Sequence, residues 1–133
     1  MKSKDVILVG IRGTAAGMGF LNPLRADGYQ LTECPSPENI AGILQDHPGA
    51  LIAVYNKPKQ DTARRILNTV SAATRHIPVI VLVDMGTFEE YYEFMCEGAY
   101  DYFELGEDPI AIERAIRYAP CCPIRPATQA AVA

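Results

Sequence analysis

Val79-Ile80-Val81-Leu82-Val83 is an uninterrupted aliphatic run, entered through Pro78, and it decides the fold class of this chain. Its residues are mostly β-branched, which favours an extended strand over a helix. A strand with one solvated face would alternate polar and apolar residues, whereas this run offers no polar face. The run therefore predicts a strand of a parallel sheet that is covered on both faces by helices.

Four other segments have the composition of strands. Val6-Ile7-Leu8-Val9 is also apolar throughout, as expected of a strand buried on both sides. Ala50-Leu51-Ile52-Ala53-Val54-Tyr55 is the third strand in chain order. Residues 30–34 form a more polar strand, which we expect at an edge of the sheet, and residues 100–104 form the fifth strand.

A pattern typical of a helix follows each of these strands. Three of the helices have recognisable start signals, and Asp108-Pro109 is the one expected at the last helix. Ser36 is the expected N-cap of the second helix, with Pro37 in its first position. Thr87 and Glu90 are expected to form a capping box at the start of the fourth helix. The alternation predicts an α/β protein of the (βα)5 type, with a doubly wound, parallel, five-stranded sheet.

The length of 133 residues allows one hydrophobic core, so we expect one domain, over residues 1–119. Residues 120–133 hold three prolines and several alanines, and we expect them to form a flexible tail or linker.

Composition excludes several classes of function. The formal net charge is −4, and no basic stripe suitable for nucleic acid is present. No apolar stretch approaches the length of a membrane span, and no secretory signal is present. The four cysteines include no C-x-x-C pair, so we expect reduced thiols and a cytoplasmic location.

Ligands of an open parallel sheet bind beyond the carboxyl ends of its strands, so catalytic residues are expected there. The third strand ends in Val54-Tyr55 and the fourth in Val83, and neither valine can attack a substrate, bind a metal or accept a proton. The sequence also lacks the G-x-S-x-G and H-E-x-x-H motifs. We therefore expect no enzymatic activity.

Four short motifs and a final Ile-rich helix occur in an order known from one family of signalling domains. The motifs are Ala26-Asp27-Gly28-Tyr29, the segment 48–58, Ile77-Pro78-Val79-Ile80-Val81-Leu82 and Gly98-Ala99-Tyr100-Asp101-Tyr102-Phe103. Over residues 5–119 they resemble the receiver domain of bacterial response regulators, a CheY-like domain. The resemblance implies the flavodoxin-like receiver architecture and a place in two-component signalling or a phosphorelay.

The residues that perform the receiver reaction do not match. By this resemblance, the two acidic residues that hold Mg²⁺ fall on Gly10 and Ile11, and the phosphate-accepting Asp falls on Val54. The Thr or Ser after the fourth strand falls on Val83, and the Lys after the fifth falls on Leu105. Transfer of a phosphoryl group to Asp needs a carboxylate nucleophile and a divalent cation. The resemblance therefore implies a degenerate pseudo-receiver that needs no Mg²⁺ or other cofactor.

A glycine-rich segment after the first strand offers an alternative function. Its G-x-x-x-G-x-G spacing resembles the fingerprint of short-chain dehydrogenases, in which a backbone at a helix N-terminus binds a pyrophosphate. The candidate ligand residues are Arg12, Gly13, Thr14, Gly17 and Gly19. The other interpretation of this segment is a turn that only takes the place of the acidic pocket in which receivers hold Mg²⁺.

A ring of polar residues in the loops after the strands is a further candidate. It comprises Arg12, Asn56, Lys57, Asp84 and Glu104. Arg12 would pair with Asp84 or Glu104 and so replace the lost network of metal and carboxylates. Unrelated loop charges are the alternative interpretation.

The surface of the last two helices and the fifth strand is the favoured functional region. One helical face cannot bury all four aromatic rings of the segment 88–94, and Tyr, Met and Arg are enriched at protein interfaces. Tyr102 also matches the switching aromatic residue of receivers, whose usual hydroxyl partner is replaced by Val83. The interface candidates are Tyr91, Tyr92, Met95, Asp101, Tyr102, Glu113, Arg114 and Arg117.

These observations favour a non-phosphorylatable, receiver-like signalling module that acts through protein–protein interaction. The expected partner is another protein, or a second copy of the chain, bound through the last two helices and the fifth strand. A small-molecule or nucleotide-binding regulatory domain that uses the glycine-rich segment is the alternative.

Overall fold

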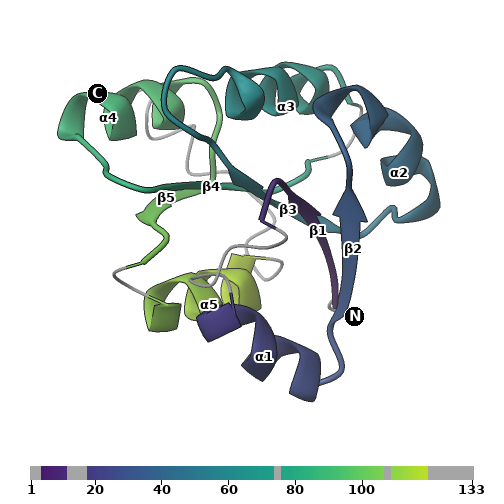
Figure 1. The fold of residues 1–133 in the computed structure, drawn as a ribbon. Helices are drawn as coiled ribbons and strands as arrows, with labels where there is room; N and C mark the ends of the chain where they lie inside the picture. The colour runs from purple at the N-terminus through teal and green to yellow at the C-terminus, as the bar shows by residue number, and fades with distance from the viewer. Residues whose placement is uncertain (1–3, 12–17, 74–75, 107–108, 120–133) are drawn as a thin grey trace.

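The computed structural model describes residues 4–11, 18–73, 76–106 and 109–119 (Figure 1). The strands are β1 (Asp5–Val9), β2 (Gln30–Cys34), β3 (Leu51–Tyr55), β4 (Val79–Val83) and β5 (Asp101–Glu104). The helices are α1 (Met18–Ala26), α2 (Ile40–Asp46), α3 (Thr62–Ser71), α4 (Phe88–Cys96) and α5 (Pro109–Tyr118), with a short 3-10 helix η2 (Pro37–Asn39) before α2.

The strands form one parallel sheet in the order β2-β1-β3-β4-β5. This is the flavodoxin-like order of a doubly wound fold, in which the chain reverses its direction of winding between β1 and β3. The predicted (βα)5 architecture is confirmed. The polar second strand lies at an edge of the sheet, as its composition indicated.

Helices cover both faces of the sheet, as Figure 1 shows: α2, α3 and α4 lie on one face, and α1 and α5 on the other. The residues of β4 alternate between these two layers. Val79, Val81 and Val83 pack with the first group of helices, and Ile80 and Leu82 pack with the second. All five side chains of β4 are buried, which explains why the strand has no polar face.

Three local predictions need correction. The fifth strand begins at Asp101, one residue later than predicted. Ser36 precedes the 3-10 helix η2, and the α-helix starts only at Ile40. The Ser36 hydroxyl makes no cap bond to the backbone and instead lies 2.9 Å from Oδ1 of Asn39. The third strand begins at Leu51, one residue later than predicted. A short 3-10 turn commonly precedes an α-helix and has the same composition, so the sequence pattern does not distinguish the two.

The described part of the chain reaches Ala119, which is buried against α1 and α5. The tail or linker predicted over 120–133, including Cys121 and Cys122, lies outside the described residues. Cys34 and Cys96 are free thiols. Among the described helices, none is both long enough and apolar enough to cross a membrane.

Candidate functional site

The carboxyl ends of β1, β3, β4 and β5 meet at one edge of the sheet, and aliphatic side chains fill it. Ile11, Val54, Val83 and Leu105 are each at most 3% exposed. Val54 and Val83 pack on the side of α2, α3 and α4, and Ile11 and Leu105 pack on the opposite side. Gly10 has a left-handed backbone with φ 76°, and a Cβ there would lie 3.3 Å from the carbonyl oxygen of Tyr55. The structure therefore places these five positions at the ends of neighbouring strands.

This arrangement makes the edge part of the hydrophobic core. An aliphatic side chain has no lone pair with which to attack phosphorus or hold a cation. Within the described residues, no group of three or more His, Cys, Asp or Glu side chains is placed to hold a metal ion.

Asn56, which follows β3, has a structural role. Its amide oxygen accepts a hydrogen bond of 3.0 Å from the N–H of Ala63, in the first turn of α3. The Asn56 N–H in turn donates to the carbonyl of Leu82 at 2.8 Å. Asn56 is buried, so these bonds satisfy polar groups that water cannot reach. They hold the loop after β3 against β4 and α3.

Asp84, which follows β4, accepts a hydrogen bond of 2.6 Å from the hydroxyl of Tyr55. This bond, with burial and the negative charge of Asp84, raises the pKa of Tyr55 to about 12. Tyr55 is buried on the α1 and α5 side of the sheet. The pair therefore ties the end of β3 to the loop after β4.

Glu104, at the end of β5, accepts a hydrogen bond of 2.6 Å from the N–H of Gly86. Tyr55 belongs to β3 and Glu104 to β5, the two strands on either side of β4. Together they hold the loop 84–87, which follows β4. The proposed pairs of Arg12 with Asp84 or Glu104 lie outside the described residues, because Arg12 does. Lys57 is exposed.

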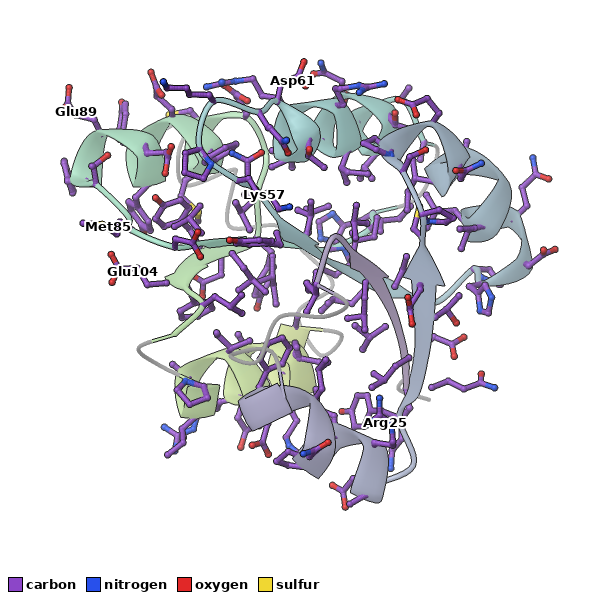
Figure 2. The ribbon with its side chains drawn as sticks, viewed as in Figure 1. Arg25, Lys57, Asp61, Met85, Glu89 and Glu104 are labelled. Carbon is purple, nitrogen blue, oxygen red and sulfur yellow. The ribbon has the colours of Figure 1, made fainter. Side chains whose placement is uncertain are left out.

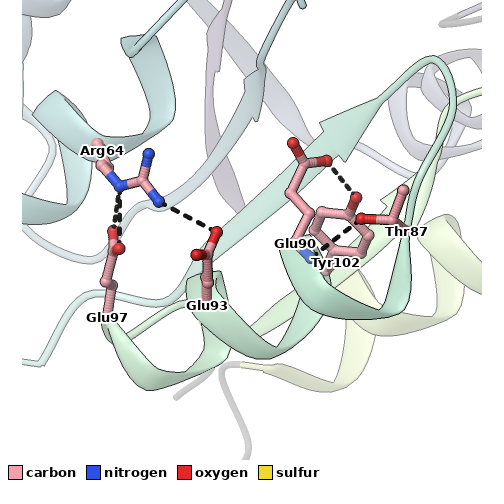
Figure 3. A network of polar contacts seen from close by, with 6 residues as sticks. All are labelled: Arg64, Thr87, Glu90, Glu93, Glu97 and Tyr102. Atoms are coloured by element: carbon pink, nitrogen blue, oxygen red, sulfur yellow. Dashed lines mark hydrogen bonds and ion pairs between the residues drawn. The ribbon is translucent and has the colours of Figure 1, made fainter.

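The predicted capping box at the start of α4 is only half formed. The Thr87 hydroxyl accepts a hydrogen bond of 3.1 Å from the N–H of Glu90, as expected. The Glu90 carboxylate, however, accepts the Tyr102 hydroxyl at 2.5 Å (Figure 3). Tyr102 is half-buried and needs an acceptor for its hydroxyl, and Glu90 supplies it. Burial first, and then the bond to Glu90, raises the pKa of Tyr102.

The ring of Tyr102 has a closely defined position. It stacks on Phe94 with a centroid distance of 5.9 Å, and Tyr91 meets it edge-on at 5.8 Å. Gly86 lies directly against it, because a Cβ at position 86 would be 2.9 Å from the Tyr102 hydroxyl oxygen. The sequence pattern did not reveal Gly86 or Glu90 as partners of Tyr102.

An open groove of about 1170 Å³ lies between the loop after β3 and helix α4. Arg64 of α3 closes one side of it: its Nε lies 2.9 Å from Glu97, and its Nη2 lies 3.5 Å from Glu93 (Figure 3). The Arg64 guanidinium also lies over the ring of Phe94, 5.4 Å from its centroid. Charges of both signs line the groove, including Lys57, Lys59, Asp84 and Glu90. This mixture does not specify one ligand.

The interface candidates on α4 and β5 differ in accessibility. Tyr91 and Tyr92 are exposed, and Met95 is partly buried against the core. Asp101 is half-buried, and this burial raises its pKa. The Asp101 carboxylate accepts the N–H of Tyr102 at 2.8 Å. The exposed candidates therefore lie on α4.

The candidates on α5 are divided between an internal contact and the surface. Arg117 pairs with Glu113 at 2.8 Å and with Asp27, after α1, at 2.5 Å. Its guanidinium also lies over the ring of Tyr29, 5.7 Å from the centroid. Arg114 is exposed. Arg117 thus contributes to the packing of α5 beside α1.

Gly19 of the glycine-rich segment lies at the contact between α1 and α5. A Cβ at this position would lie 3.3 Å from the Cβ of Pro109, so glycine allows the two helices to pack closely. The other ligand candidates of this segment, Arg12, Gly13, Thr14 and Gly17, lie outside the described residues. Helix packing accounts for Gly19 without a bound nucleotide.

No protein-family model matches this chain. No curated protein matches it either. Solved structures do match. The crystal structure of FixJ-N is 20% identical, with a TM-score of 0.73, over 93% of this chain and 98% of that one. The receiver domain of the response regulator NarL from Mycobacterium tuberculosis is 15% identical, with a TM-score of 0.70, over 92% of this chain and 99% of that one.

The chain has the fold of a response-regulator receiver domain. A third structure with this receiver fold is an atypical orphan response regulator, described as having a phosphorylation-independent regulatory mechanism. It is 20% identical to this chain, with a TM-score of 0.68, over 87% of this chain and 93% of that one. The fold implied by the short motifs is thereby confirmed.

Proposed function

We propose that this protein is a non-phosphorylatable pseudo-receiver that transmits a signal through contact with another protein. The observation that carries the proposal is the aliphatic edge of the sheet. Ile11, Val54 and Val83, which stand where receivers keep a metal ligand, the phosphate-accepting Asp and a hydroxyl, are buried. A receiver fold without this chemistry keeps its surface as the means of signalling.

A shift in alignment does not restore the reaction. The segment 50–60 around β3 holds no Asp or Glu, so no neighbouring residue replaces Val54 as the phosphate acceptor. By the resemblance, the Lys that contacts the phosphoryl group in receivers falls on Leu105, which is buried. Each missing group has a different role in the reaction, and the loss of all of them supports a domain that is not regulated by phosphorylation.

The loop after β4 supports the same proposal. Tyr55, Glu104 and Glu90 hold the loop and Tyr102 in place through hydrogen bonds inside the protein. The surface of α4 and β5 is therefore formed without a phosphoryl group. We propose that this surface, continued by α5, contacts the partner or a second copy of the chain. The free thiols of Cys34 and Cys96 support a cytoplasmic setting.

Incubation with acetyl phosphate and Mg²⁺, and separately with beryllofluoride and Mg²⁺, tests the proposal. We expect the intact mass to stay unchanged and the amide spectrum of the protein to show no shift at β3, β4 or the loop 84–87. A receiver domain that retains its Asp serves as the positive control. One phosphoryl group per chain, held as an acyl phosphate, would refute the proposal.

A further inference from the structure

The region from Asp84 to Glu104 combines exposed apolar side chains with charged residues that are all negative. Met85 is 85% exposed, Phe88 78%, Tyr92 56% and Tyr91 39%. These four residues, which we name the α4 patch, lie in the loop before α4 and on its first two turns. Large apolar side chains exposed next to one another are typical of a surface that a partner covers.

A small hollow of about 380 Å³ lies beside the α4 patch. Phe88, Tyr91, Tyr102 and Phe103 supply its apolar walls, and Glu104 lies at its rim. Phe88 stacks on Tyr91 with a centroid distance of 6.3 Å, and Tyr91 contacts Tyr102. Because Glu90 and Gly86 hold Tyr102 in place, one wall of the hollow is preformed. The hollow is shallow and open, and it has room for a large side chain of a partner.

The segment that forms the hollow carries negative charge only. The segment 84–104 contains seven Asp and Glu residues and no Lys, Arg or His. Glu89 and Glu104 lie on the same side of the molecule as Met85, beside α4 and β5 (Figure 2). Asp84 and Glu90 accept hydrogen bonds from tyrosine hydroxyls, which are neutral donors. On the side away from the hollow, both also line the groove that contains Lys57 and Lys59. Arg64 offsets part of the charge of Glu93 and Glu97, farther along α4.

This charge disfavours a second copy of the chain as the occupant. In a symmetric dimer centred on the α4 patch, each copy would bring its own carboxylates against those of the other. Like charges placed across an interface cost several kcal/mol. Lys and Arg side chains on a different partner would instead pair with these carboxylates and accelerate association.

We propose that the α4 patch binds a positively charged protein segment that inserts one large apolar side chain into the hollow beside Phe88 and Tyr102. Lys or Arg residues of that segment flank the inserted side chain and face Glu89 and Glu90. The inference rests on the proposed function, because it names the partner chemistry of the signalling surface. The hollow supplies the apolar anchor, and the carboxylates supply the charge preference.

Selection from a library of random peptides tests the inference. The full chain is the bait, and a Phe88→Ser variant is used for counter-selection. We expect the retained peptides to combine Lys or Arg with one aromatic or aliphatic residue. Their affinity should fall at least about tenfold in Phe88→Ser, as for the loss of an interface anchor, and should weaken with added salt. Glu89→Lys should weaken binding further.

Ile110→Ser is the matched control, because Ile110 is a similarly exposed apolar residue on α5. Its affinity for the selected peptides should equal that of the unchanged protein. Retained peptides that are acidic or uncharged, binding that survives Phe88→Ser, or a failure to retain any peptide would each overturn the inference.

Self-association separates this inference from the proposed function. If light scattering detected a dimer that Phe88→Ser dissociates, the proposal of a positively charged partner would be overturned. The proposed function as a signalling module would not be affected. Phosphorylation by acetyl phosphate would refute the pseudo-receiver, even if basic peptides bound at the α4 patch.

Discussion

The aliphatic edge of the sheet and the loop 84–87 are neighbours in the chain, yet they differ in burial and in the interactions that stabilise them. Val83 ends β4 fully inside the core, whereas Asp84, the next residue, is exposed and accepts a hydrogen bond. At the aliphatic edge, the side chains stabilise the structure by packing. In the loop, hydrogen bonds to Tyr55 and Glu104 do so, next to exposed apolar side chains. The comparison teaches that residues next to one another in the chain can be stabilised by different interactions, according to their burial.

The largest effect is expected from introducing a polar group into the aliphatic edge. Val54→Asp would bury a carboxylate at a position with 0% exposure, among apolar side chains. An uncompensated buried charge costs about 3–5 kcal/mol, so the variant should be strongly destabilised or unfolded. Urea unfolding of the variant measures this loss.

Val54→Thr is the control for that experiment, because it changes the shape little and adds no charge. We expect it to lose about 1–3 kcal/mol, the cost of a buried hydroxyl without a partner. If Val54→Asp were as stable as the unchanged protein, the aliphatic edge would be open to water, and the contrast with the loop would disappear.

A smaller effect is expected at Gly86, where the loop meets Tyr102. In Gly86→Ala, the new Cβ would lie 2.9 Å from the Tyr102 hydroxyl oxygen, so the ring or the loop must move. Overpacking of this kind costs about 1–3 kcal/mol. The tyrosine ring signals of Tyr102 in the NMR spectrum should shift as well.

Gly42→Ala is the matched control for Gly86→Ala. Gly42 lies within α2, and a Cβ there would contact nothing within 4 Å. The same substitution should stabilise the protein by about 1 kcal/mol, because alanine is the better helix former. Equal effects at the two positions would contradict a specific contact between Gly86 and Tyr102.

The smallest effect is expected for the bond between Tyr102 and Glu90. Tyr102→Phe should lose about 1 kcal/mol, and Glu90→Gln should lose less. In the double variant, the two losses should not add, because Tyr102→Phe removes the donor of the hydrogen bond and Glu90→Gln weakens the acceptor of the same bond. Denaturant unfolding of the four proteins measures this coupling, and strictly additive losses would argue against the bond.

The same pair predicts how stability depends on pH. The pKa of Tyr102 in the folded protein is raised above its ordinary value of 10.0. The protonated Tyr102 hydroxyl therefore stabilises the folded protein at neutral pH. This stabilisation is lost as the pH rises above the ordinary pKa and through the raised pKa of the folded protein. In this alkaline range, the free energy of unfolding of Tyr102→Phe should decrease less steeply with rising pH than that of the unchanged protein.

Much of the fold could be predicted from local patterns. The apolar run of β4 and the alternation of strands with helices were sufficient for the parallel sheet, because burial on both faces excludes polar residues. Start signals were less reliable, as Ser36 shows, since a 3-10 turn and an α-helix share the same first residues. The positions of Val54 and Val83 could also be predicted, because Val54 is the last but one residue and Val83 the last residue of strands that were recognisable in the sequence.

The contacts of the surface region could not be predicted in this way. Glu90 fits the capping-box pattern, yet it bonds to Tyr102, which lies 12 residues away in the sequence. Arg117 is an interface residue by type, yet it pairs with Asp27, which is 90 residues away in the sequence. In both pairs the partners come from different elements, and their distance depends on how the helices pack on the sheet.

The sequence by itself therefore determined the sheet and its apolar strand ends. Hydrophobic burial acts on every residue of a strand and leaves a regular local pattern. Only the tertiary structure decided which aromatic side chains are buried and which remain exposed on α4. It also decided that Gly86, Glu90 and Tyr102 form one preformed wall of a hollow. Such contacts depend on a few ångströms between distant segments, and no local pattern encodes that distance.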